Sequence, residues 1–240
     1  AMRVANDLLS GARIQKNKHL FVSPLRDFIF EKDGKWFVAI WSEKGKQSIQ
    51  TFLGHNAQIW NPLGTRETYG SGRGTVVDAL PLFITDIDPH LLQTLLTLRF
   101  HPEETGQPAD SNLPMVTDPI VKRIQFTNHY PTDLVGIRIK INQPIPAGWD
   151  IRPLEIQSSR LSKTSVFSKP ISIRLPQTEQ AGQKKIRMTL TFFREDDQNR
   201  PYIITTERDL IVTPKIIIRD TVASVGSNPN RKRVLIRIEN

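Results

Sequence analysis

The sequence contains no cysteine, which excludes disulfides, zinc–thiolate sites and thiol nucleophiles. It also lacks any apolar run near the roughly 18–20 residues of a membrane helix, and its first residues lack the apolar segment of a signal peptide. No asparagine begins an Asn-x-Ser/Thr sequence, the acceptor of N-linked glycans. These absences remove several classes of site but identify no compartment.

Motifs of catalysis and metal binding are missing as well. There is no Gly-x-Ser-x-Gly turn for a nucleophilic serine, and the five histidines show no short ligand spacing. The acidic pairs fall in turns or at strand ends, where carboxylates are usually solvated: Glu103-Glu104, Asp86 with Asp88, and Asp196-Asp197. We therefore predict no catalytic residue, no cofactor and no metal ligand. The segment is predicted not to be an enzyme, with a self-contained hydrolase as the alternative.

The composition favours a folded chain with many turns. Of 240 residues 38% are hydrophobic, and 17 prolines and 13 glycines supply turn positions. We predict an all-β fold class, two antiparallel β-sandwich (Ig-like) domains of about 100 residues each, with a short N-terminal helix. The predicted divisions are a helix at residues 1–18, a β-sandwich module at 19–100 and a linker at 101–119. An Ig-like β-sandwich follows at 120–215, and a further strand region starts at 216–240.

Apolar residues at helical spacing predict one convincing helix over Met2–Leu9, which Gly11 ends. Its apolar stripe needs a partner, which is either the sandwich or a domain outside this sequence. We favour the second, because Arg231–Asn240 also has a strand pattern that stops without a turn. On this interpretation the chain is an excerpt of a longer protein.

Alternation of period two begins at Asp27, and Asp33-Gly34 predicts a two-residue type I′ hairpin turn. The return strand is Trp36–Trp41, and Ser48–Leu53 completes a predicted three-stranded meander. The signals over Asp88–Phe100 are mixed, so we expect a turn of helix that runs into a strand.

The stretch His101–Pro119 is rich in Pro, Asp, Glu and Gly and is predicted to be a linker or a long loop. Beyond it the alternation becomes stricter. Val135–Ile141 and Ile186–Phe192 each place apolar residues on one face and polar residues on the other. About seven such strands predict an immunoglobulin-like sandwich.

Parts of the second half carry a family resemblance: Phe126–Pro131, then Val135–Ile141, then Pro144–Trp149. This order resembles the Ig-like domains found with alpha-galactosidases and with carbohydrate-binding NPCBM modules. The resemblance covers roughly residues 100–215 and implies a β-sandwich with a Pro-x-Gly-Trp corner.

The first half resembles the all-β module that closes many glycoside hydrolase barrels. The residues that carry this resemblance are Trp36–Ser42, Ser48–Gly54, Ile59–Gly64 and Leu80–Ile84, with Asn61 where Asp is more usual and Phe83 where Tyr is more usual. The resemblance implies that the first helix is the last helix of a catalytic (β/α) barrel, and that the parent is a large, secreted or cell-surface glycosidase-like protein. It supplies no catalytic residue here. The implied role is a non-catalytic accessory and structural one, with neighbouring domains of the same polypeptide as partners.

The four tryptophans suggest a second function. Aromatic faces bind sugar rings, and Trp60, beside a turn, is the tryptophan that we expect to be most exposed. A carbohydrate-binding module in which Trp60 contacts polysaccharide is therefore the alternative. Pro146, Gly148 and Trp149 are predicted to form a structural corner, because Pro fixes φ, Gly permits positive φ and the indole can fill the core.

The net charge of +9 brings nucleic acid into consideration. Nucleic-acid surfaces interleave basic residues with exposed aromatics. Here the basic residues alternate with apolar-phase positions, as on any solvated strand face: Arg138, Lys140, Arg174, Lys184, Lys185 and Arg187. We therefore rank nucleic-acid binding below the accessory and carbohydrate-binding roles.

Overall fold

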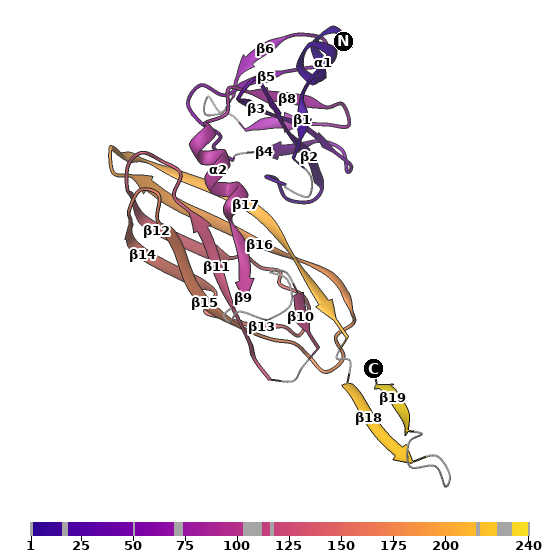
Figure 1. Ribbon diagram of the computed structural model, residues 1–240. Coiled ribbons are helices and arrows are strands. Elements are labelled where there is room, and N and C mark those ends of the chain that lie inside the picture. The colour runs from indigo at the N-terminus through magenta and orange to yellow at the C-terminus, as the bar shows by residue number, and fades with distance from the viewer. Residues whose placement is uncertain are drawn as a thin grey trace.

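The structure is a computed structural model that describes residues 2–15, 19–49, 51–69, 74–102, 112–115, 118–214, 217–224 and 232–239. It consists mainly of antiparallel strands in two units, with the first unit above the second in Figure 1. The predicted fold class, two β-sandwich units with a short N-terminal helix, is confirmed. Within the described residues no helix has the length and apolar character that crossing a membrane requires.

The described residues of the first unit form one helix and eight strands: α1 (Met2–Leu9), β1 (Arg13–Ile14), β2 (Leu25–Lys32), β3 (Lys35–Ser42), β4 (Gln47–Ile49), β5 (Gln58–Trp60), β6 (Arg66–Thr68), β7 (Thr75–Val77) and β8 (Leu82–Thr85). Six of the strands form one sheet in the order β1-β2-β3-β8-β5-β6, and β4 pairs with β7. The helix has the bounds that the apolar spacing predicts.

The β2–β3 hairpin has the predicted type I′ turn, because φ is 51° at Asp33 and 72° at Gly34. The predicted three-stranded meander is wrong. Instead of pairing with β3, β4 pairs with β7, and β8 takes the place beside β3. The reason is burial: Ile49 and Val77 on this pair belong to the same core as Ile29 on the inner face of the sheet.

The mixed signals that follow β8 belong to a helix that runs into a strand, as expected: α2 (Pro89–Thr97) and β9 (Arg99–Pro102). The Asp88 carboxylate caps α2, since it accepts hydrogen bonds from the backbone N–H groups of His90 (2.9 Å) and Leu91 (3.2 Å). Pro89 suits the first helical turn, where no intrahelical bond from its nitrogen is needed.

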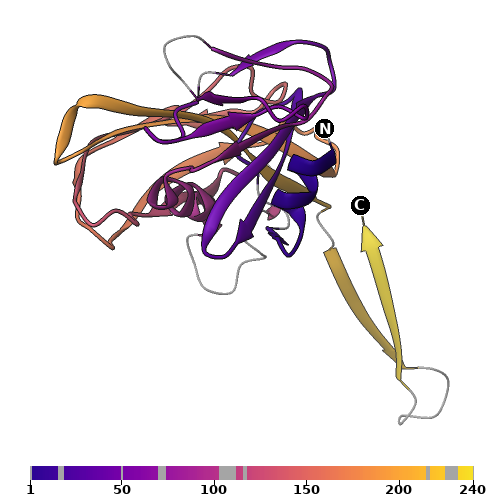
Figure 2. The ribbon, with the colours of Figure 1, turned by 90° about the horizontal axis from the view of Figure 1, so that it is seen from above.

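The second unit is a sandwich of two sheets: β10 (Asn112–Pro114), β11 (Ile120–Thr127), β12 (Leu134–Ile141), β13 (Asp150–Arg152), β14 (Glu155–Leu161), β15 (Val166–Arg174), β16 (Gly182–Arg194) and β17 (Asp197–Thr213), with β9. One sheet has the order β10-β17-β16-β12-β14, and the other β13-β15-β11-β9. The predicted alternation is observed over Ile186–Phe192 of β16, where every second side chain is buried. Beyond this sandwich, β18 (Ile217–Ser224) and β19 (Lys232–Glu239) form an antiparallel hairpin (Figures 1 and 2).

The predicted linker, residues 101–119, contributes a strand to the second unit. Within it, β10 pairs in parallel with the end of β17, and Leu113 is fully buried. The composition of the segment concealed this strand, because one apolar residue among polar neighbours produces no periodicity.

The two units meet in a joint formed by Phe52 and Asp88 of the first unit and Tyr130, Tyr202 and Arg208 of the second. Phe52 packs edge-on against Tyr202, with ring centroids 4.9 Å apart. Tyr130 donates a hydrogen bond from its hydroxyl to Asp88 Oδ2 (3.1 Å). Burial and the neighbouring carboxylate raise the pKa of Tyr130, so its hydroxyl keeps its proton. Buried residues of both units belong to one hydrophobic cluster.

Arg208, on β17, closes the C-terminal end of α2. Its guanidinium donates to the carbonyl oxygens of Leu95 (2.7 Å), Leu98 (2.7 Å) and His19 (3.2 Å). The Leu95 carbonyl also accepts the Leu98 N–H (3.2 Å), and the guanidinium adds a second donor to it. A cation at the C-terminal end of a helix also complements the helix dipole. Burial lowers the pKa of Arg208 to about 10, which leaves the side chain charged at neutral pH.

Candidate functional site

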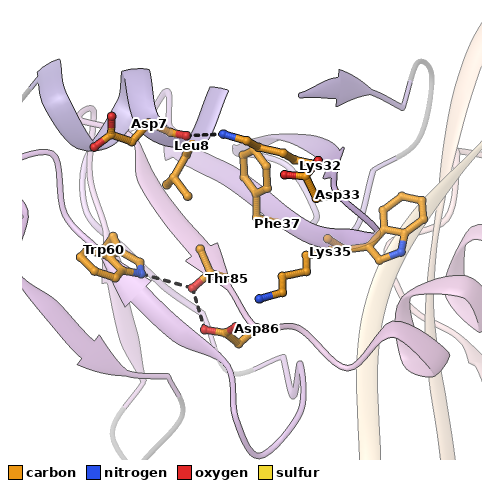
Figure 3. A pocket seen from close by; sticks show the side chains of 10 residues that line it. Asp7, Leu8, Lys32, Asp33, Lys35, Phe37, Trp60, Thr85 and Asp86 are labelled. Atoms are coloured by element: carbon orange, nitrogen blue, oxygen red, sulfur yellow. Dashed lines mark hydrogen bonds between the residues drawn. The ribbon is translucent and has the colours of Figure 1, made fainter. Parts of the chain in front are cut away.

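Trp60, the predicted glycan contact, lines a pocket between α1 and the six-stranded sheet. The pocket has a volume of about 380 Å³, and Figure 3 shows the side chains around it. Asp7 and Leu8 come from α1, and Asp33 comes from the β2–β3 turn. Asp86 directly follows β8. The hairpin, the helix and the end of the sheet therefore all contribute to one concave site.

The indole of Trp60 is held in place by its neighbours. Its Nε1 donates to Thr85 Oγ1 (3.2 Å), and the Thr85 hydroxyl donates to Asp86 Oδ2 (3.2 Å). The guanidinium carbon of Arg66 lies 5.4 Å from the centroid of the Trp60 ring, a cation–π arrangement. Trp60 is half-buried, as Trp36 is.

The charged side chains of the pocket are of both signs. Asp33 and Asp86 have φ of 51° and 53°, in the left-handed region that Asp adopts more readily than most residues. Lys32 Nζ donates to the carbonyl oxygen of Asp7 (2.5 Å) and so links the hairpin to α1. The Lys35 ammonium has no hydrogen-bond or ion-pair partner in the described parts of the chain, and it points toward Thr85 and Asp86 in Figure 3.

Sequence reasoning identified Trp60 but not its pocket neighbours. Asp33 was recognised only as a turn residue and Asp86 only as a solvated carboxylate, while Lys35 carried no signal. The two-residue turn at Asp33-Gly34 predicts that the return strand begins near Lys35. Lys35 and Phe37 could then have been predicted to lie on one face of that strand, because alternate residues of a strand share a face. Nothing local indicates that this face meets Trp60, since β8 lies between β3 and β5.

The outer side of this sheet carries an aromatic face, which consists of Phe28, Phe30, Phe37 and Trp41. Phe30 stacks on Phe37 (centroids 5.1 Å apart), and Phe28 contacts Trp41 (5.4 Å). Around Phe37, the side chains of α1 cover the face, because Ala5 and Leu8 pack there. At the other end Phe28 is 45% exposed.

The predicted corner places Trp149 in the hydrophobic core, on the side of the second unit. Trp149 is 5% exposed, Gly148 has a φ of 77°, and the Trp149 N–H donates to the Pro146 carbonyl (3.1 Å). The indole Nε1 donates to Glu179 Oε2. Burial raises the pKa of Glu179, but hydrogen bonds from Lys184 and Trp149 outweigh it and hold that pKa below its ordinary value.

Several basic residues weighed for nucleic acid are paired with carboxylates. Lys184 contacts Glu179 (2.6 Å), Arg187 contacts Glu207 (3.1 Å) and Arg138 contacts Glu155 (3.3 Å). These pairs reduce the positive potential that a polyanion would need.

The acidic pairs of the sequence are dispersed in the fold. Asp86 lines the pocket while Asp88 caps α2, and Asp196 pairs with Arg194 while Asp197 lies 3.8 Å from His55. Glu103-Glu104 lies outside the described residues. In the part of the chain that the structure describes, no group of three or more His, Cys, Asp or Glu side chains is arranged to hold a metal ion.

The chain matches no protein-family model and no curated protein. Among solved structures it is similar to the VesB protease of Vibrio cholerae, at 10% identity and a TM-score of 0.30, over 77% of this chain and 48% of VesB. It is similar to PapD-like domain 7 of human CEP192 at 11% identity and a TM-score of 0.27, over 49% of this chain and 84% of that domain. The secreted serine protease VesC of Vibrio cholerae is similar at 10% identity and a TM-score of 0.28, over 65% of this chain and 33% of VesC.

These comparisons correct one prediction. The prediction that this segment is not an enzyme is contradicted, since two of the structures named above are proteases. The chain spans about half the length of VesB and a third of VesC, and a likeness of this size assigns no protease residue to it. The resemblance to glycosidase-associated modules stays a prediction.

Proposed function

We propose that this chain is the accessory β-sandwich segment of a larger, secreted or cell-surface glycosidase-like protein. Its neighbouring catalytic domain, in the same polypeptide, packs on the open end of the aromatic face. One observation carries the proposal: α1 covers the face around Phe37 and leaves the end at Phe28 open. The helix that the family resemblance assigns to a barrel thus lies on the same surface.

The open end has the character of an interface. Phe28 is 45% exposed although Ala39, its register partner on the same face, is buried. Ile14, 41% exposed, is the register partner of Phe30 on the same face. Exposed large apolar side chains that adjoin one another mark interaction surfaces more often than isolated ones do.

The joint supports a scaffold role. The Arg208–His19 hydrogen bond and the Phe52–Tyr202 contact fix the second sandwich to the first. A domain seated on the aromatic face would therefore hold both units in one orientation. A flexible tether would need none of these contacts.

The proposal is tested on the complete natural polypeptide with Phe28→Asp. Activity on a panel of aryl-glycosides is measured after heating, and we expect a lower inactivation temperature. Burial of a Phe contributes about 1.5–3 kcal/mol, and each kcal/mol shifts the melting temperature of a domain of this size by about 2–4 °C. The aspartate side chain would be charged, so it could not be buried against the neighbouring domain as the Phe28 ring is on this proposal.

The matched control is Val166→Asp on β15. Val166 is 56% exposed and lies in the second sandwich, away from the aromatic face. Equal inactivation temperatures for the wild type and both variants would contradict the proposed interface. A complete polypeptide without glycosidase activity would contradict the proposed parent.

A further inference from the structure

We propose that the pocket beside Trp60 binds a short neutral glycan. The Trp60 indole supplies an apolar surface for a sugar ring, and Lys35 and Asp86 bind its hydroxyl groups. This inference does not depend on the interface proposed above, because Phe28 does not line the pocket.

The dimensions and lining of the pocket suit a small ligand. Its volume of about 380 Å³ falls within the range of about 300–1,000 Å³ that is typical of small-molecule sites. Such sites combine apolar and aromatic walls with a few convergent polar groups. Here Leu8, Phe37 and Trp60 form the apolar walls, and Lys35 and Asp86 are polar groups of the lining.

The charges indicate a neutral ligand. The carboxylates of Asp7, Asp33 and Asp86 are accompanied by Lys32 and Lys35 in the lining, and Arg66 pairs with Asp86 (3.9 Å). An anion would meet the carboxylates of Asp33 and Asp86. A cation would compete with Arg66 for the Trp60 ring and meet the two lysines. A ligand with many hydroxyl groups can both donate to the carboxylates and accept from Lys35.

The site is organised before any ligand arrives. The Trp60–Thr85–Asp86 hydrogen bonds fix the indole and one carboxylate together, so binding does not have to order them. The Lys35 ammonium, without a partner in the described residues, keeps its donors available for a ligand.

The test is a titration of the chain with cellohexaose, xylohexaose, mannohexaose and maltohexaose, followed by tryptophan fluorescence and saturation-transfer NMR. Inorganic phosphate and tetramethylammonium serve as the charged probes. We expect saturable binding of at least one hexaose at millimolar concentration or below. We also expect Trp60→Ala and Lys35→Met each to weaken this binding at least about tenfold.

Lys35→Met keeps the test decisive if Trp60→Ala unfolds, because Lys35 is exposed and packs in no core cluster. The controls are Trp41→Ala, on the same sheet but outside the pocket, and Lys44→Met, on an exposed loop; both should bind as the wild type does. The proposal is overturned if no hexaose saturates the chain. Unchanged binding in Lys35→Met, or binding of phosphate or tetramethylammonium in place of the hexaoses, overturns it as well.

Discussion

At the scale of single residues, Trp149 is 5% exposed and belongs to the main core, whereas Trp60 is half-buried against Arg66 and Thr85. Both lie next to a turn in the sequence, so their local signals are nearly alike. What separates them is the set of distant partners, Glu179 for one indole and Thr85 for the other. The corner at Trp149 could be predicted from Pro and Gly, but neither hydrogen-bond partner could.

Replacement of Trp149 by alanine should destabilise the chain by about 3–5 kcal/mol, the usual cost of removing a buried large aromatic. The variant would also leave Glu179 with one hydrogen bond fewer. The measurement is urea unfolding followed by circular dichroism. Trp149→Phe, which keeps a ring in the core, should lose distinctly less of the free energy of unfolding. If Trp149→Ala unfolds at the wild-type urea concentration, the indole is not part of the core.

At the scale of elements, the features with local causes were predictable and those with distant causes were not. The β2–β3 hairpin follows from Asp33-Gly34 alone. β4 pairs with β7 because this pair packs Ile49 and Val77 into the same core as the inner face of the sheet. The meander prediction was therefore wrong at this point. The candidate site shows the same division, because Trp60 is one local signal whereas the pocket needs α1, β3, β5 and β8 together.

Gly54 lies where the first unit approaches α2, and Gly54→Ala tests how close this packing is. A Cβ added there would stand 2.9 Å from Asp88 Cβ and 3.0 Å from Asp88 N, at a φ of 113°. Because the obstacle includes backbone, we expect a loss of about 2–3 kcal/mol in the free energy of unfolding.

Gly45→Ala is the matched control for this variant. Gly45 also has a positive φ, 68°, but no atom lies within 4 Å of its added Cβ. Gly45→Ala should lower the free energy of unfolding only by the cost of an alanine in the left-handed backbone conformation, about 1 kcal/mol. Equal losses in the two variants, measured by urea unfolding, would show that Asp88 moves away from the added methyl group without difficulty.

At the scale of the whole molecule, the joint makes the two sandwiches one body. Its aromatic contacts and the bonds of Arg208 join residues that are far apart in the chain. Neither could be anticipated from alternation, which reports only which face of a strand is buried. The sequence therefore predicts two units but does not predict how firmly they are attached.

Arg208→Met should uncouple the units. We expect the wild type to unfold in one transition and the variant in two, because the His19 carbonyl of the first unit loses its bond to Arg208. The Leu98 carbonyl loses its donor as well, at about 1–3 kcal/mol for a buried unsatisfied group. Differential scanning calorimetry measures this directly. The control is Arg160→Met, which removes exposed ion pairs with Asp133 and Glu195 and should change stability little. A single transition at the wild-type temperature in Arg208→Met would contradict the coupling.

The same contact sets an order of events on the ribosome. Leu95 and Leu98 are synthesised 113 and 110 residues before the guanidinium that closes their end of the helix. At about 5–20 residues per second, translation takes on the order of ten seconds to cover this distance. During that interval the end of α2 lacks the Arg208 guanidinium, and Phe52 lacks its contact with Tyr202. Chaperones and proteases therefore have access to this surface until β17 emerges.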